Sequence, residues 1–121
     1  MDAEAVINEL KKRYPGKTII KLPKDKPAEI ICEIEPVSGH SDFSIAIAVI
    51  TGTAPHYNDG TETYEVLKGD LVLTLDKQVL RLKPEDKCVI RPGVIHSTKA
   101  NGAWVKVTTR PGWTPSGHHL I

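Results

Sequence analysis

Short apolar stretches separated by turn residues fill most of the chain. They lie at residues 17–22, 28–37, 43–52, 62–69, 70–76, 78–82, 87–92 and 103–109. Turn sequences rich in Gly, Pro, Asn, Asp and Ser separate several of them, at residues 38–42, 58–60, 84–86 and 100–102. Many short strands at this spacing, with no crossover helices between them, predict an all-β sandwich or small antiparallel barrel and exclude a parallel α/β fold.

The first residues follow a helical period instead. Apolar side chains recur every three or four positions, at Ala3, Val6, Ile7, Leu10 and Tyr14. The Pro15–Gly16 pair then ends the pattern. Asp2 stands near the expected start of this helix. The sequence therefore predicts one short N-terminal helix within residues 1–15, outside the β-structure.

Length and charge limit the kind of protein. A chain of 121 residues is long enough for one domain with one core and too short for two of ordinary size, so residues 1–121 are expected to form a single domain. Sixteen Lys and Arg against fifteen Asp and Glu give a net charge of +1, with no block of like charges. We therefore expect no nucleic-acid or membrane partner, but a small molecule or a second copy of the chain.

No stretch of the sequence predicts membrane insertion or export. The longest strongly apolar run, residues 43–50, is shorter than the roughly 18 residues that span a bilayer. The N-terminus has charged residues among its apolar ones, unlike a signal peptide. Cys32 and Cys88 are far apart in apolar stretches, which favours reduced thiols. These features predict a cytoplasmic protein.

The C-terminal residues 111–121 are irregular but not polar. Their two prolines and two glycines argue against a regular element, while Trp113, Leu120 and Ile121 need apolar surroundings. We expect this tail to dock on the β-structure. His118 and His119 within it are interpreted as ligands that reach back over the barrel, as part of a cover, or as part of a mobile end.

The candidate chemistry lies at residues 55–69. In a strand, His56 and Asn58 point to the same face, and Glu62 returns on the other arm of a hairpin after the Asp59–Gly60 turn. His96, after the Pro92–Gly93 turn, is placed to add a second imidazole. Two imidazoles and one carboxylate that converge inside a barrel suit a divalent Fe, Mn, Ni, Co or Zn ion.

These residues resemble the two motifs of the cupins. The first motif, G-x5-H-x-H-x3,4-E-x6-G, is matched at Gly52, His56, Asn58, Glu62 and Gly69. The second, G-x5-P-x-G-x2-H, is matched at Gly93 and His96. The chain departs from the motifs at four points: Gly52 is too close to His56, Asn58 replaces the second His, Glu85 replaces the first Gly of the second motif, and Arg91 replaces its Pro.

The resemblance covers about residues 43–110 and implies a cupin-type, jelly-roll-like antiparallel β-barrel with a metal bound inside it. The ligands carried over are His56, Glu62 and His96, with Asn58 carried over in position only. Because a neutral amide oxygen binds late transition metals less well than an imidazole, the site is expected to hold its metal weakly.

Two side chains have open roles. Asn58 is interpreted as a turn residue, as a weak oxygen ligand, or as a hydrogen-bond donor to a metal-bound water. Tyr64, on the same face as Glu62, either fills the core or donates its hydroxyl. The catalytic candidates are therefore Glu62 and Tyr64.

The resemblance favours a metal-dependent enzyme on a small polar substrate, such as a sugar isomerase or epimerase. An iron-dependent dioxygenase and a non-catalytic binding or sensor protein are the alternatives. Free sheet edges in a barrel of this size also predict a homodimer, with residues 17–22 as the strand that pairs across it.

Overall fold

A computed structural model describes residues 1–36 and 41–121, so the predicted turn at 38–42 falls largely outside the described residues. The elements within these ranges are α1 (Ala3–Arg13), β1 (Thr18–Leu22), β2 (Glu29–Glu35), β3 (Ser44–Asn58), β4 (Thr61–Lys68), β5 (Leu71–Leu75), β6 (Gln78–Leu82), β7 (Lys87–Ile90), β8 (His96–Arg110), a 3-10 turn η1 (Pro115–Gly117) and β9 (His118–Leu120).

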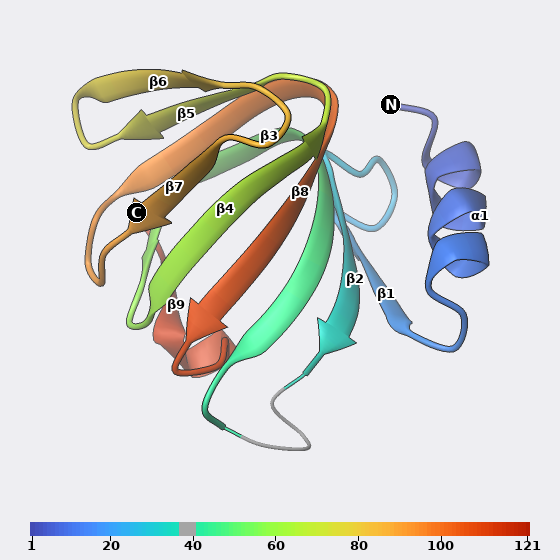
Figure 1. The fold of residues 1–121 in the computed structure, drawn as a ribbon, viewed down its shortest axis with the longest axis horizontal. Helices are drawn as coiled ribbons and strands as arrows, with labels where there is room; N and C mark the ends of the chain where they lie inside the picture. The colour runs from blue at the N-terminus through green and yellow to red at the C-terminus, as the bar shows by residue number, and fades with distance from the viewer. Residues whose placement is uncertain (37–40) are drawn as a thin grey trace.

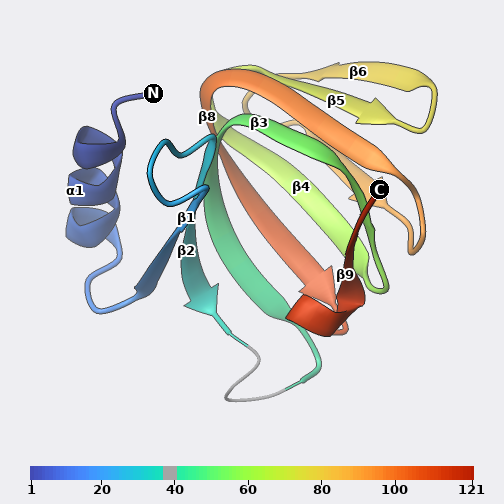
Figure 2. The same ribbon diagram turned by 180° about the vertical axis from the view of Figure 1, so that it is seen from behind.

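The strands form one antiparallel sheet that bends over on itself. Its main order is β1-β2-β3-β8-β4-β7, while β5 pairs with β6 and β8, and β9 pairs with β3. Figures 1 and 2 show an open, jelly-roll-like arrangement, with α1 standing outside it beside β1 and β2. The predicted all-β cupin-type architecture with one short N-terminal helix is confirmed.

The long strands β3 and β8 connect the two halves of the bent sheet. Each has 15 residues, and the β8 pairing with β3 shifts register between Ile50 and Gly52 and again between Thr53 and His56. Residues 100–102, predicted as a turn, lie inside β8, where Gly102 has a φ of +78°. The turn-forming sequence there produces an irregularity within a strand, because a bulge uses the same left-handed conformation as a turn.

The main core lies between the two halves of the sheet. Alternate residues of the strands point inward, and the buried set is Ala48, Ile50, Tyr64, Val66, Leu71, Leu73, Leu82, Ile90, Ala103 and Val105. Because neighbours along a strand point to opposite faces, this inner set fixes which polar residues face the same interior.

The opposite face of β2 and β3 packs against α1. Leu10 of the helix is fully buried against Ile30, Cys32 and Val49. The helix begins after Asp2, whose carboxylate accepts a hydrogen bond from the Ala5 amide at 3.1 Å. In the described residues, no helix has both the length and the apolar character needed to cross a membrane.

Gly69, just after β4, tests how closely the chain packs against β8 at this point. It has a φ of +79°, and a Cβ there would lie 3.3 Å from the Cα of Ala103, whereas Gly16 has a φ of +78° with no atom within 4 Å. Gly16→Ala should lower the free energy of unfolding by about 1 kcal/mol through its left-handed backbone alone. Gly69→Ala should cost about 1–2 kcal/mol more, because the backbone of β8 must move.

Chemical denaturation of the two variants measures this difference. Equal losses at both positions would show that the contact with Ala103 costs nothing.

Candidate metal centre

Three buried polar side chains meet between β3, β4 and β8. His56 and His96 are direct cross-strand partners in the β3–β8 ladder, and Glu62 projects from β4. One ligand atom from each lies within 4.8 Å of the other two. The structure thus brings together the two imidazoles and the carboxylate that the sequence placed on one site.

Hydrogen bonds fix the protonation of both imidazoles. The Nδ1 of His56 lies 2.7 Å from the Ala54 carbonyl, and the Nδ1 of His96 lies 2.9 Å from the Val94 carbonyl. A carbonyl oxygen only accepts, so each Nδ1 carries the hydrogen. In a neutral ring, each Nε2 then has a free lone pair, which is the form that binds a metal.

The contact between His96 and Glu62 favours a bound cation. The His96 Nε2 lies 3.1 Å from the Glu62 Oε1, yet this buried nitrogen has no hydrogen-bond partner among the described residues. With the hydrogen on Nδ1, a nitrogen lone pair faces a carboxylate oxygen. Two acceptors at this distance repel each other, and a divalent ion between them would remove the repulsion. The residues present therefore fit a metal.

Asn58, at the end of β3, supports this cluster from the side. Its Nδ2 donates to the Glu62 Oε1 at 2.7 Å, and its Oδ1 accepts from the His118 Nδ1 at 3.0 Å. The amide side chain is buried, and the Asp59–Gly60 turn begins only after it. Asn58 therefore ends the strand and orients the carboxylate, while its oxygen points to the tail.

Burial determines the charge of the neighbouring groups. Desolvation lowers the pKa of His56, so the neutral ring is favoured at neutral pH. Desolvation also raises the pKa of Tyr64, with the Glu62 charge adding to the effect. Tyr64 lies edge-on to His96, with ring centroids 6.1 Å apart. It therefore packs in the core and also keeps a neutral hydroxyl beside the site.

Glu29 is a further carboxyl that the sequence analysis did not select. It is the cross-strand partner of Ile50, a core residue, so its side chain faces the barrel interior. Desolvation and the charge of Glu62 raise its pKa from 4.5 to about 7. The signal in the sequence is weak, because β2 also contains Glu33 and Glu35 at the same two-residue alternation as Glu29.

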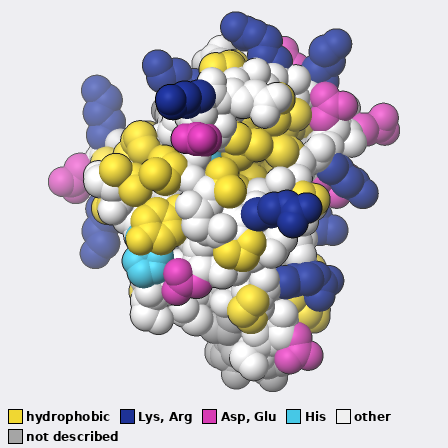
Figure 3. All heavy atoms as spheres, turned by 90° about the vertical axis from the view of Figure 1, so that its left-hand side faces the viewer, with side chains coloured by type: hydrophobic (Ala, Val, Ile, Leu, Met, Phe, Trp, Pro, Cys, Tyr) yellow, Lys and Arg dark blue, Asp and Glu magenta, His cyan; other side chains and the backbone are white. Residues whose placement is uncertain are grey.

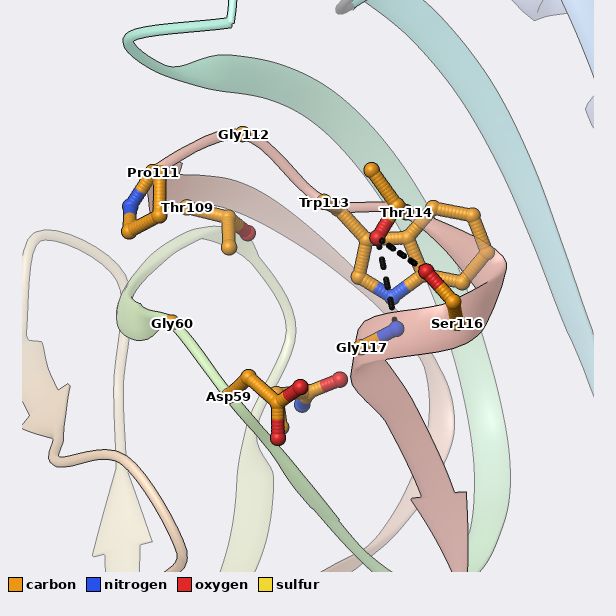
Figure 4. A pocket seen from close by; sticks show the side chains of 10 residues that line it. Asp59, Gly60, Thr109, Pro111, Gly112, Trp113, Thr114, Ser116 and Gly117 are labelled. Carbon is orange, nitrogen blue, oxygen red and sulfur yellow. Dashed lines mark hydrogen bonds between the residues drawn. The ribbon is translucent and has the colours of Figure 1, made fainter.

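The C-terminal tail lies against the hairpin that carries His56 and Asn58. β9 pairs with residues 56–58 of β3, and the Gly117 carbonyl accepts from the Asp59 amide at 2.8 Å. A cavity of about 110 Å³ separates the hairpin turn from the rest of the tail (Figure 4). Its lining includes Asn58, Asp59, Trp113 and Thr114, so it reaches the edge of the site.

Residues 45–108 match the cupin domain, which places the chain in the cupin family. The two motifs, with His56, Glu62 and His96 in register, fall inside this range.

Known proteins resemble the chain over part or most of its length. It is 33% identical to the uncharacterized protein YdbB of Bacillus subtilis over 67 residues, which are 53% of this chain and 59% of that protein. The chain thus spans little more than half of that relative. A Streptomyces Pac13 variant with bound uridine superposes with a TM-score of 0.75 at 13% identity, covering 89% of this chain and 87% of that one. KdgF from Halomonas sp. superposes with a TM-score of 0.64 at 17% identity, covering 77% of this chain and 93% of that one. At these identities the two structures support the fold alone.

The raised pKa of Glu29 predicts how stability depends on pH. Between 4.5 and about 7 the folded chain holds a proton on Glu29 that the unfolded chain has lost. Stability from this group is therefore present at low pH and lost as pH rises through about 7. Glu29→Gln stays neutral throughout, so with chelator present the parent should lose about 2–3 kcal/mol relative to the variant from pH 5 to pH 8.

Urea denaturation at several pH values measures this loss. The comparison cancels the opposite contribution of His56, whose lowered pKa costs stability as pH falls. Parallel pH profiles for parent and variant would show that the Glu29 carboxyl is solvated.

Proposed function

We propose that the protein binds a divalent first-row transition metal through His56, Glu62 and His96, and acts with it on a small polar molecule as an isomerase or epimerase. The observation that carries this proposal is the unpartnered His96 Nε2, 3.1 Å from the Glu62 Oε1. Two free imidazole lone pairs and a carboxylate form a donor set that suits Fe, Mn, Co, Ni or Zn.

A metal held there supplies Lewis acidity, which polarises a carbonyl or hydroxyl oxygen of the substrate. The protein's own part is to hold the donors. The Ala54 and Val94 carbonyls fix the two rings, and the Asn58 amide fixes the Glu62 carboxylate. Partners of this kind orient the ligands and increase their basicity.

Proton transfer is assigned to the interior groups beside these donors. Isomerisation next to a carbonyl needs a group that removes a proton and a group that donates one. Glu29, with a pKa of about 7, exchanges a proton readily at neutral pH. Tyr64 retains its hydroxyl hydrogen and suits a donor. Glu62, already bonded to Asn58 and facing His96, is assigned to the metal.

A related fold supports a small substrate with hydroxyl groups. Pac13 is described as a nucleoside dehydratase, and one of its structures contains uridine. A cupin barrel of comparable size therefore accommodates a sugar-containing molecule. We propose a small polar molecule of the same chemical kind as the substrate of this chain.

The first test of the proposal is metal content. Protein purified without a histidine tag should carry a transition-metal ion by elemental analysis, at less than one per chain because the site is expected to bind weakly. Isothermal titration calorimetry with Zn²⁺, Ni²⁺ or Co²⁺ should show one site after chelation and dialysis. His96→Ala should weaken binding by more than about 100-fold, because an inner donor contributes more than its supporting partners. His119→Ala is the matched control, since His119 lies on the surface and contacts Asp59.

Each other result has a clear meaning. Chain that binds none of these ions would overturn the metal proposal and leave a non-catalytic binding protein. Iron with substrate-dependent oxygen uptake would replace the isomerase assignment by a dioxygenase.

A homodimer is also proposed, on the basis of the sheet edge at β1. This strand ends the main sheet, and its outer backbone groups face no neighbouring strand among the described residues. Pairing with a second β1 would satisfy these groups. A second candidate surface for dimer contacts includes Val79 of β6 and Val89 of β7, which are both 58% exposed. On the side of the molecule seen in Figure 3, hydrophobic side chains gather between basic ones.

Light scattering after size exclusion, at tens of micromolar protein, should give the mass of two chains in both low and moderate salt, since backbone pairing is not screened. A single-chain mass under these conditions would contradict the dimer.

A further inference from the structure

His118 of the C-terminal tail stands opposite the position where the family motif has its second histidine. Asn58 and His118 are cross-strand partners in the β3–β9 ladder. Directly opposed residues of an antiparallel pair point to the same face, with Cβ atoms about 4.5–5.5 Å apart. His118 therefore faces the site from the strand next to position 58, while His119 faces outward, stacks on Tyr57 and contacts Asp59.

The surroundings of His118 bring its ring to the edge of the three-residue cluster. Its centroid lies 4.9 Å from that of His56, compared with 4.1 Å between His56 and His96. Trp113 packs near the ring, at 5.8 Å. The ring is thus the third member of a row of imidazoles that begins at His96.

The hydrogen bond to Asn58 sets the chemistry of the His118 ring. An amide oxygen only accepts, so the His118 Nδ1 carries the hydrogen. The Nε2 of the neutral ring then has a free lone pair. His118 thus matches the protonation of His56 and His96, each of which gives its Nδ1 hydrogen to an oxygen.

We propose that His118 is a fourth metal ligand, supplied by the tail, which replaces the imidazole that Asn58 removes from the first motif. The proposal rests on metal binding by His56, Glu62 and His96. In the structure, His118 lies beside these residues rather than among them, because its bond to Asn58 holds the ring. To coordinate the metal, the ring would turn toward the centre while β9 stays paired with β3.

This arrangement restores the third imidazole of the family motifs, which is absent here because Asn58 replaces a histidine. Two imidazoles and a carboxylate from the barrel, with a third imidazole from β9, give four protein donors. It also gives Asn58 two tasks: its NH₂ group holds Glu62, and its oxygen holds His118 beside the site while no metal is bound. Metal binding should then order the tail on the barrel.

The experiment compares His118→Phe with His119→Phe in the full chain. Phenylalanine keeps the aromatic packing against Trp113 and His56 and removes the nitrogen, while the same change at His119 affects an outward-facing ring. Each protein is loaded with Cu²⁺ as a probe, and pulsed electron paramagnetic resonance counts the coordinated imidazoles. Calorimetry with Zn²⁺ or Ni²⁺ measures affinity.

We expect three imidazoles in the parent and in His119→Phe, and two in His118→Phe. The affinity of His118→Phe should fall by more than about tenfold, since even supporting partners of a ligand contribute 10–100-fold. Two imidazoles in all three proteins, with equal affinities, would overturn the role of His118 and leave the three-residue site intact. Absence of binding in the parent would overturn the site itself, and with it this proposal.

Discussion

The pairing of β3 with β8 is the interaction on which the rest of the structure depends. These two strands run through both halves of the bent sheet, and every other strand except β1, β6 and β7 pairs directly with one of them. Their register shifts near Gly52 and Thr53 let His56 become the direct partner of His96. A regular ladder would rotate one of the rings out of the interior, because a shift of one residue moves a side chain to the other face.

In the candidate centre, the two imidazoles donate their hydrogens to groups outside the cluster, and the carboxylate accepts one from Asn58. Backbone carbonyls take the Nδ1 hydrogens of His56 and His96, and Asn58 donates to Glu62. One ligand atom each of His56, Glu62 and His96 lies within 4.8 Å of the other two. A cluster of buried acceptors is unfavourable alone, since each has lost its contact with water. A bound cation would offset that penalty, which is why these donors fit a metal.

The sequence was sufficient to predict the helix, most of the strands and the residues that meet at the centre, because strand alternation and motif spacing are local properties. It did not predict β9, which lies in a tail expected to be irregular, or the continuation of β8 through residues 100–102. Asn58 shows the limit of this reasoning. Its neighbours Asp59 and Gly60 indicated a turn, and the structure places Asn58 at the last position of β3 with its side chain buried. Glu29 was not selected from the sequence, and His118 was named only under one of three interpretations of the tail, for a different reason. Each reaches the site through pairing with β3, and pairing partners distant in sequence leave no periodic signal in either segment.

The two faces of strand β2 carry different kinds of side chain. Ile30 and Cys32 pack under α1, while Glu29 and Ile31 face the barrel interior. If β2 slipped by one residue against β3, a carboxylate would enter the apolar layer beneath Leu10, and Ile30 would leave it. Such a slip is costly on both faces at once. Glu29 and Ile30, on opposite faces of β2, therefore both favour the one alignment of β2 with β3 that the structure shows.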